Sequence, residues 1–212
     1  MTLSVRIEDK TYRRANGASL PVFRDFALDV PAGEICAISG PSGIGKSTLL
    51  AIVAGLDRDF KGRVSGEVAP LGMAFQTPRL LPWLTARRNV ELVMQGRNTD
   101  AGRWLEAVGL AGHEDVYPER LSVGMARRVA IARALAVEPA LLLLDEPFAS
   151  LDPAAAAVNV TLLKSTFAKR AMTVLLVTHD VEQVARLATR VVCLAGSPAQ
   201  VVSDTMARRA LP

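Results

Sequence analysis

Residues that are typical of proteins stabilised by disulfide bonds or by structural metal ions are scarce in this sequence. Among 212 residues there are only 2 cysteines and 2 histidines, and aromatic residues make up 5%. Cys36 and Cys193 each lie in an apolar, β-branched stretch, so we expect both to be core thiols, as fits a reduced cytoplasm. A chain of this length buries enough surface to fold without a disulfide or a structural metal.

Long apolar runs are also missing, and with them any sign of a membrane span or a secretory signal. The longest candidates, at 49–56 and 140–144, suit a buried helix and a buried strand. They are far shorter than the roughly 20 residues that cross a bilayer. Arg6 and Glu8 place charges near the start of the chain, and no apolar segment of signal-peptide length follows. We therefore expect the chain to be soluble by itself.

No low-complexity composition and no concentrated charge of one sign is present. Hydrophobic residues make up 50% and charged residues 22%, which excludes a disordered tail protein. The net charge is +4, and its arginine pairs at Arg87–Arg88, Arg127–Arg128 and Arg208–Arg209 are scattered between apolar stretches. A nucleic-acid-binding domain would show a basic stripe with interleaved aromatic residues, so no nucleic-acid partner is expected. The mean hydropathy of +0.25 instead suggests surface that is buried against a protein partner.

The hydrophobic pattern changes twice along the chain. Alternating or buried runs predict strands at 3–7, 23–30 and 34–39, a helix follows at 45–55, and short strands lie between 63 and 75. From 77 to 136 the period is helical, with helices expected at 86–95 and 100–108 and from Ser122 to Ala136. The middle of the chain is therefore expected to form an inserted helical part.

The last third alternates strands with helices. Strands are expected at 141–144, 173–178 and 190–194, and helices open at Asp152 and Asp180. Such alternation is typical of a parallel sheet covered on both faces. The whole pattern predicts an α/β fold with a mostly parallel core sheet, an N-terminal antiparallel β part and an inserted α-helical part.

A glycine-rich segment lies between the strand at 34–39 and the helix at 45–55. It reads Gly40, Pro41, Ser42, Gly43, Ile44, Gly45, Lys46, Ser47 and Thr48, which contains the complete pattern G-x-x-x-x-G-K-[ST]. Glycines let the backbone turn tightly, so that successive N–H groups face phosphate oxygens at the positive end of the next helix. Lys46 can reach the β- and γ-phosphates, and the Ser47 hydroxyl can bind Mg²⁺. The segment therefore predicts a cradle for ATP.

Two acids follow the leucine strand at 141–144. In an open parallel sheet, ligands lie at the carboxyl ends of the strands, so Asp145 and Glu146 are expected beside the cradle. Adjacent strand residues point in opposite directions and cannot share one role. We assign Asp145 to the Mg²⁺ shell through water, and Glu146 to orienting or deprotonating the attacking water. Without the cradle, the pair would read as solvated acids in a turn.

With these motifs in place, the chain resembles the nucleotide-binding subunit of ABC transporters over essentially its whole length. Four further elements occur in the family's order: the Gln loop at Gln76, the signature at Leu121–Met125, the D-loop at Asp152 and the switch histidine at His179. The resemblance implies a P-loop NTPase fold and ATP hydrolysis. It also implies that Gln76 contacts Mg²⁺ or the lytic water, and that His179 lies near the γ-phosphate.

The resemblance also implies how the single domain 1–212 is divided. Residues 1–76 and 137–212 would form the nucleotide-binding core with its β subdomain, and residues 77–136 the helical signature subdomain. Two copies would bind two ATP molecules between them, head to tail. Ser122 at a helix N-terminus would then meet the γ-phosphate held by the other copy, since that helix end carries about half a unit of positive charge.

The signature departs from the family at two positions. Val123 stands where the family usually has glycine, and Met125 where it has glutamine, whereas Ser122 and Gly124 keep the family's residues. A β-branched residue disfavours a positive φ. We therefore expect an adjusted or weaker sandwich that still hydrolyses ATP.

Tyr12 allows two interpretations. An aromatic residue stacks on adenine at a similar place in the family, but Tyr12 precedes the cradle by more residues than the family leads us to expect, with Arg13–Ser19 resembling a loop insertion. It can therefore be the adenine-stacking residue or an ordinary tyrosine at the end of a strand.

Residues 77–85 bear on the type of transporter. This stretch is similar to the one after the Gln loop in importers of nitrate, sulfonates and taurine, although it also fits a generic apolar docking loop. Import is favoured over export, and no appended regulatory domain is expected. The implied partners are a second ATPase copy, identical or not, polytopic membrane permease subunits and a substrate-binding protein, at the cytoplasmic face of the cell membrane. A non-transport ABC-type ATPase and a regulatory module without catalysis remain as alternatives.

Overall fold

A computed structural model describes residues 2–13, 15, 17–66, 69–94, 100–149, 153–169, 172–179 and 187–206, without the side chains of 153–155 and 158. The chain forms two compact units. The first unit comprises Met1–Val68 and Thr173–Pro212, and the second comprises Ala69–Met172. Within the described residues, no helix has the length and apolar character that a bilayer crossing requires.

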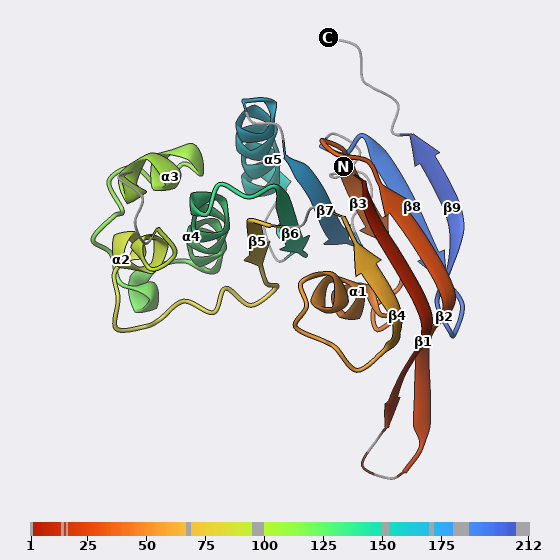
Figure 1. The fold of residues 1–212 in the computed structure, drawn as a ribbon. Coiled ribbons are helices and arrows are strands. Elements are labelled where there is room, and N and C mark those ends of the chain that lie inside the picture. The colour runs from red at the N-terminus through yellow and green to blue at the C-terminus, as the bar shows by residue number, and fades with distance from the viewer. Residues whose placement is uncertain are drawn as a thin grey trace. The chain divides into compact units, whose positions relative to one another are not determined.

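A three-stranded antiparallel sheet forms one part of the first unit, in the order β2-β1-β4. Its strands are β1 (Leu3–Arg13), β2 (Ser19–Val30) and β4 (Lys61–Ser65). β1 and β2 run side by side as a long hairpin (Figure 1), paired from Leu3 with Val30 to Arg13 with Ser19. The expected loop insertion at Arg13–Ser19 is thus shorter than predicted, because its two end residues belong to paired strands.

The second sheet of the first unit contains β3 (Ile35–Ser39), β7 (Thr173–Thr178), β8 (Arg190–Ala195) and β9 (Gln200–Met206). β3 pairs in parallel with both β7 and β8, and β9 pairs antiparallel with β8. β3 and β7 are almost wholly buried, which is why they read as continuous apolar runs. The edge strand β9 alternates exposed and half-buried residues over its first half, and the sequence analysis missed it.

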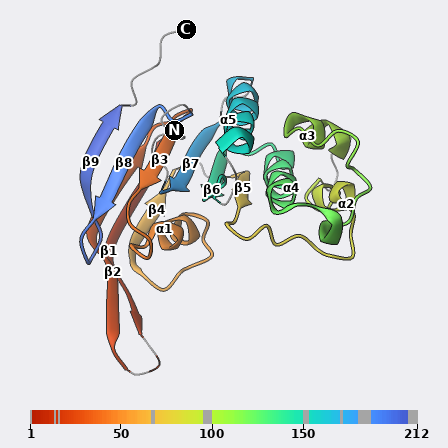
Figure 2. The ribbon, with the colours of Figure 1, turned by 180° about the vertical axis from the view of Figure 1, so that it is seen from behind.

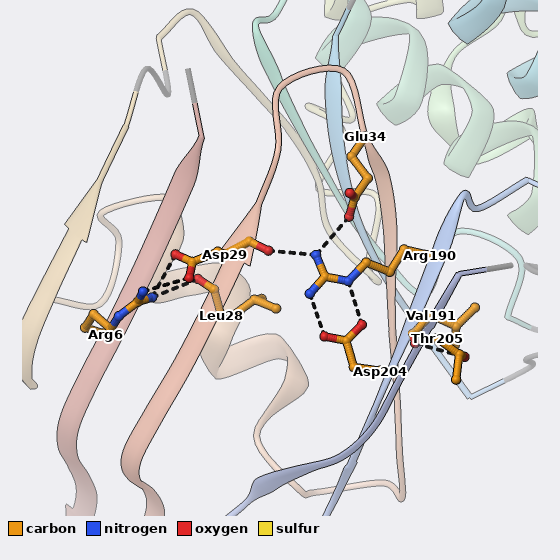
Figure 3. A network of polar contacts seen from close by, with 8 residues as sticks. All are labelled: Arg6, Leu28, Asp29, Glu34, Arg190, Val191, Asp204 and Thr205. Atoms are coloured by element: carbon orange, nitrogen blue, oxygen red, sulfur yellow. Dashed lines mark hydrogen bonds and ion pairs between the residues drawn. The ribbon is translucent and has the colours of Figure 1, made fainter.

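One arginine ties several of these strands together. Arg190 donates hydrogen bonds to the carbonyl oxygen of Asp29 (2.8 Å) and to Glu34 Oε1 (3.1 Å), and through two nitrogens to both carboxylate oxygens of Asp204 (2.6 Å each) (Figure 3). The side chain of Asp29 binds Arg6 in turn, at 2.7 and 2.9 Å. The hydrogen bonds from Arg190 hold the pKa of Asp204 below its usual value. Arg190 thereby joins β8 to β9, to β2 through Asp29, and to the turn between β2 and β3 through Glu34.

The second unit contains a parallel pair of strands and a group of helices. The strands are β5 (Leu71–Ala74) and β6 (Leu141–Asp145), and the helices are α2 (Ala86–Glu91), α3 (Ala101–Ala107), η1 (Pro118–Arg120), α4 (Val123–Ala136) and α5 (Pro153–Ala168). α2, α3 and α4 lie together (Figure 2), and α4 packs on β5. Gly72 permits this approach, because a Cβ there would overlap the carbonyl oxygen of Ala134.

The predicted fold class is confirmed: the structure is α/β, with an N-terminal antiparallel sheet, a core sheet in which parallel pairing dominates, and a helical part inserted between β5 and β6 in the sequence. The helix from Ser122 begins and ends as predicted, with Ser122 as its N-cap and Ala136 as its last residue. The helix expected after Asp180 lies outside the described residues.

Candidate nucleotide-binding site

The segment Gly40–Thr48 directly follows β3 and opens α1 (Lys46–Val53) in the first unit. Its glycines have φ values of 153°, 79° and 110°. A Cβ on Gly40 would lie 2.6 Å from the carbonyl oxygen of Leu194, and a Cβ on Gly45 would overlap the side chain of Val22. Both the backbone conformation and the close neighbours therefore require glycine at these two positions.

The start of α1 is suited to an anionic ligand. Gly45 is its N-cap and supplies no side-chain hydrogen bond, and the first turn contains no acidic residue. Lys46 is buried, and its Nζ donates to the carbonyl oxygens of Gly40 (2.7 Å) and Pro41 (2.9 Å). A helix N-terminus with backbone amides and an adjacent lysine is the arrangement that holds phosphate groups. The cradle thus fits a triphosphate on the grounds of geometry and charge.

Tyr12 lies beside this cradle and is fixed by three neighbours. Its hydroxyl donates to Asp57 Oδ2 at 2.9 Å and lies 3.3 Å from Thr48 Oγ1, and the Nζ of Lys10 lies 4.3 Å from the ring centroid. Lys10 is buried and is paired with Asp57, with 2.9 Å between Nζ and Oδ1. Lys10 and Asp57 were missed by the sequence analysis. The only available signal was the spacing of Lys10 and Tyr12, two residues apart on one strand.

His179 and the cradle lie at the same end of two parallel strands, their carboxyl ends. β3 and β7 are parallel neighbours, and Ser39 is paired with Thr178. The next residues along the chain, Gly40 and His179, therefore both leave the carboxyl ends of adjacent strands, where ligands bind in open parallel sheets. His179 is exposed, whereas Thr178 is buried.

Gln76, Asp145 and Glu146 are brought together in the same way within the second unit. β5 and β6 are parallel, and Ala74 is paired with Leu144. Gln76 follows β5 by two residues, and Asp145 and Glu146 stand at and just beyond the end of β6, so all three belong to one sheet edge. Their oxygen donors, two carboxylates and an amide, belong to the hard ligand type that Mg²⁺ prefers.

Glu146 has an unusual backbone. Its φ is 47°, in the left-handed region that non-glycine residues rarely adopt, and its side chain is largely buried. The backbone N–H of Ala149 donates to its carbonyl oxygen at 3.2 Å. Strained conformations of this kind cluster at functional sites. The turn after β6 therefore holds a largely buried carboxylate on a left-handed backbone.

The segment after Gln76 is clamped by α4. Arg133 donates to the carbonyl oxygens of Arg79 (3.1 Å) and Pro78 (3.0 Å), and the guanidinium of Arg79 lies 4.0 Å from the centroid of the Phe75 ring. Burial lowers the pKa of Arg133. Arg79 has a φ of 48°, so this loop also contains a left-handed residue. Arg133 is a third residue, after Lys10 and Asp57, that the sequence analysis did not single out as part of the site.

A buried asparagine shapes the following turn. Asn89 Nδ2 donates to the carbonyl oxygens of Leu81, Leu84 and Thr85, and its Oδ1 accepts from the backbone of Leu81 at 2.8 Å. Trp83, within this turn, is 69% exposed. The fixed turn thus presents a large apolar side chain to the outside of the second unit.

Ser122 and Val123 lie at the start of α4. Ser122 Oγ accepts from the backbone N–H of Met125 at 3.2 Å, as in a helix N-cap. Val123 is the first residue of α4, does not have a positive φ and is 59% exposed, and Gly124 follows within the helix. The sequence analysis assumed a positive φ at Val123, which a β-branched residue would disfavour. That assumption was wrong, because α4 starts in ordinary helical geometry.

The structure therefore gathers the predicted residues into groups within each unit. The first unit holds Gly40–Thr48, Tyr12 and His179 near one another, and the second holds Gln76, Asp145 and Glu146 at one sheet edge, with Ser122 and Gly124 at the start of α4. Asp152 lies outside the described residues. Ser47, assigned to Mg²⁺, is the second residue of α1.

Comparisons with known proteins agree with these motifs. The model of the family described as ABC transporter matches residues 23–149. The chain is 42% identical to "Aliphatic sulfonates import ATP-binding protein SsuB 1" of Pseudomonas savastanoi pv. phaseolicola, over 95% of this chain and 84% of that protein. It is 40% identical to "Aliphatic sulfonates import ATP-binding protein SsuB" of Bacillus licheniformis, over 95% and 83% of the two chains.

The fold comparison gives the same result. The structure is similar to the dimeric structure of MJ0796, a bacterial ABC transporter cassette, with a TM-score of 0.85 and 30% identity over 97% of this chain and 99% of that one. A post-hydrolysis state of the same cassette, bound to ADP and Pi, matches with a TM-score of 0.84. The family model covers more than half of the chain, and the relatives cover nearly all of it. The chain therefore belongs to the ABC transporter family, as one of its ATP-binding and ATP-hydrolysing subunits.

Proposed function

We propose that this ATPase subunit powers the import of aliphatic sulfonates. The single observation that carries the assignment of nucleotide binding is the geometry of the cradle. Gly45 packs closely against Val22, and Lys46 lies buried at the start of α1, which has no side-chain cap. The substrate class is supported by the SsuB relatives, which are 36–44% identical. These relatives do not favour the alternative of a non-transport ATPase.

Within the cradle, each residue has a distinct proposed role. The backbone amides of Gly40–Ser47 and the Nζ of Lys46 bind the β- and γ-phosphates, with Thr48 extending the first turn of α1. To bind a phosphate, Lys46 exchanges its present carbonyl partners on Gly40 and Pro41 for phosphate oxygens. Tyr12 stacks on the adenine base. ATP supplies the phosphoryl group, and a bound Mg²⁺ neutralises the charge that develops on it.

The acids and their neighbours would direct water. Glu146 orients or deprotonates the water that attacks the γ-phosphate, and its buried, backbone-fixed position supports this role. Ser47, Asp145 and Gln76 supply oxygen donors for Mg²⁺, Asp145 through water. His179 stabilises the transferring group from the edge that it shares with the cradle.

We further propose that two copies act together. The dimeric cassette to which the chain is similar supports this arrangement. Ser122 and Gly124 of one copy would face the γ-phosphate bound by the other, where the free amides and the positive end of α4 favour anions. Asp152 would contribute to the same dimer contact. In this scheme 77–136 is the signature subdomain, and 1–76 with 137–212 is the nucleotide-binding core.

The membrane partner would dock on the turn that Asn89 fixes. Trp83 is exposed there on an ordered backbone, so a permease subunit can bury it without first ordering the turn. The complex would include polytopic permease subunits and a substrate-binding protein, with this chain peripheral at the cytoplasmic face of the cell membrane.

Uptake of labelled sulfonates tests the proposal. A strain lacking this gene is complemented with the wild-type chain or with Glu146→Gln, and uptake of an alkanesulfonate, of taurine and of nitrate is measured. Only the wild type should restore alkanesulfonate uptake. Restoration by both variants would refute the need for hydrolysis, and restoration of nitrate uptake alone would refute the substrate class.

A further inference from the structure

The cluster of Lys10, Tyr12, Thr48 and Asp57 is more elaborate than a stacking platform requires. All four residues belong to the first unit: Lys10 and Tyr12 lie on β1, Thr48 lies on α1, and Asp57 follows α1 by four residues. A strand-end tyrosine would be stable here without a buried lysine beneath it. The position of a buried lysine against the ring of Tyr12 therefore calls for an explanation.

Lys10 is fixed on several sides. Its side chain is 1% exposed, and Nζ donates to Asp57 Oδ1 at 2.9 Å and to the carbonyl oxygen of Asp59 at 2.6 Å. The Asp59 carboxylate adds a weaker ion pair at 3.7 Å. Burying an ammonium is costly unless its donors are satisfied, and here they are. Nζ also lies 4.3 Å from the centroid of the Tyr12 ring.

Asp57 bridges the lysine and the tyrosine. One carboxylate oxygen accepts from Lys10 and the other accepts from the Tyr12 hydroxyl at 2.9 Å. Burial tends to raise the pKa of Asp57, but hydrogen bonds from Lys10, from Tyr12 and from the backbone of Asp59 outweigh it, and the net pKa is lowered. The carboxylate is therefore ionised at neutral pH and can hold both donors at once.

These contacts restrict Tyr12 to one orientation. The hydroxyl is held by Asp57 and by Thr48 of α1, and one face of the ring is taken by the ammonium of Lys10. The side chain is nevertheless exposed enough, at 38%, to receive a ligand. A ligand would then meet the face away from Lys10, and the contact with Thr48, two residues after Lys46, ties the ring to the cradle.

We propose that Lys10 and Asp57 are positioning residues that hold Tyr12 as a one-sided platform for a planar base, and so supply the base-dependent part of nucleotide affinity. The inference rests on the proposed function, in that a nucleotide binds at Gly40–Thr48. A platform whose orientation is set in advance loses little freedom when the base binds. Without Lys10 or Asp57 the ring can rotate. Each binding event then has to order the ring, and the entropy lost in doing so lowers the affinity for the nucleotide.

The test compares a ligand with a base and a ligand without one. Affinities for Mg-ATP and for magnesium tripolyphosphate are measured by calorimetry on the full chain and on Lys10→Met, Asp57→Asn, Tyr12→Phe and Tyr12→Leu. Base–aromatic stacking is of a size that predicts a loss of about 5- to 100-fold in ATP affinity for Tyr12→Leu. Lys10→Met and Asp57→Asn should lose about 5- to 20-fold for ATP, and tripolyphosphate affinity should stay within about twofold.

The Tyr12→Phe variant and one added control variant separate positioning from folding. Tyr12→Phe keeps the ring, loses only the hydroxyl anchors and is partly exposed, so it tests the proposal even if Lys10→Met does not fold; it should lose about 3- to 10-fold for ATP alone. Arg103→Met is the matched control, because Arg103 pairs with Glu138 at 2.8 Å and lies over the Trp104 ring in the second unit. It should leave both affinities unchanged.

The outcomes are distinct. Unchanged ATP affinity in Tyr12→Phe and in the Lys10 and Asp57 variants would overturn the positioning role, and so would equal losses for ATP and tripolyphosphate. A wild-type chain that binds neither ligand would overturn the proposed function at Gly40–Thr48, and this proposal with it.

Discussion

Arg133 holds the backbone of Pro78, with 3.0 Å between its guanidinium nitrogen and the carbonyl oxygen. α4 carries Arg133 near its end, and Ser122 is its N-cap, so a single 14-residue helix has the signature at one end and a clamp on the Gln-loop segment at the other. Both ends belong to the second unit. A shift of the signature end therefore moves the residues that follow Gln76 without any intervening hinge.

Removing this clamp should lower the turnover of ATP by more than the accompanying loss of stability can explain. Arg133→Met loses two charged hydrogen bonds and should lower the free energy of unfolding by about 1.5–3 kcal/mol, while kcat for ATP falls about tenfold or more because Gln76 loses its support. Arg128→Met is the control, since Arg128 donates to the carbonyl oxygens of Val108 and Gly109 at the end of α3 and not to the segment after Gln76. Equal loss of kcat in both variants would contradict the argument.

Replacing the strained carboxylate should separate binding from hydrolysis. Glu146→Gln keeps the size of the side chain but removes its charge, so ATP turnover should fall by about 10²–10⁴-fold, with ATP affinity retained. Lys46→Ala should instead weaken nucleotide binding itself, because Lys46 lies in the cradle. Calorimetry measures the binding and phosphate release measures the turnover of both variants. An equal loss of nucleotide binding in Glu146→Gln and Lys46→Ala would contradict these roles.

The left-handed backbone of Glu146 gives a separate stability prediction. At a φ of 47°, glycine avoids the clash between Cβ and backbone that costs other residues about 1–2 kcal/mol. Glu146→Gly should therefore be about 1 kcal/mol more stable than Glu146→Ala in urea unfolding, although both are inactive. A more stable alanine variant would show that the turn relaxes to a negative φ.

Much of the fold and of the site was predictable from the sequence because short-range patterns decide them. The cradle between a strand and a helix, the leucine strand ending in Asp145 and the cap at Ser122 each depend on residues that are close together in the sequence. The hydrophobic period likewise placed β3, β6 and β7, since buried parallel strands are continuous apolar runs.

The features that were missed depend on partners far along the chain. The edge strand β9 has five exposed residues among its seven, so its sequence resembles a polar tail. Lys10 meets Asp57 across 47 residues, and Arg133 meets Pro78 across 55, and no local period indicates either contact. The φ of Val123 was also misjudged, because the family's glycine suggested a left-handed residue where α4 starts normally.

Acid should weaken the Arg190–Asp204 contact in a defined window. The pKa of Asp204 is lowered in the folded state by hydrogen bonds from Arg190, so its contribution to stability is fully present above the ordinary aspartate value of about 4 and is lost as the pH falls through the lower folded value. Asp204→Asn removes this contribution at every pH. The difference in unfolding free energy between wild type and Asp204→Asn should therefore be constant from about pH 7 to 5 and shrink below about pH 4.

Urea titrations at several pH values measure this difference, with Asp115→Asn as an exposed control that has no resolved ion pair among the described residues. A difference that stays constant down to about pH 2.5, below the ordinary range of aspartate, would show that Arg190 does not depend on the charge of Asp204 and is held by the Asp29 carbonyl and Glu34 alone.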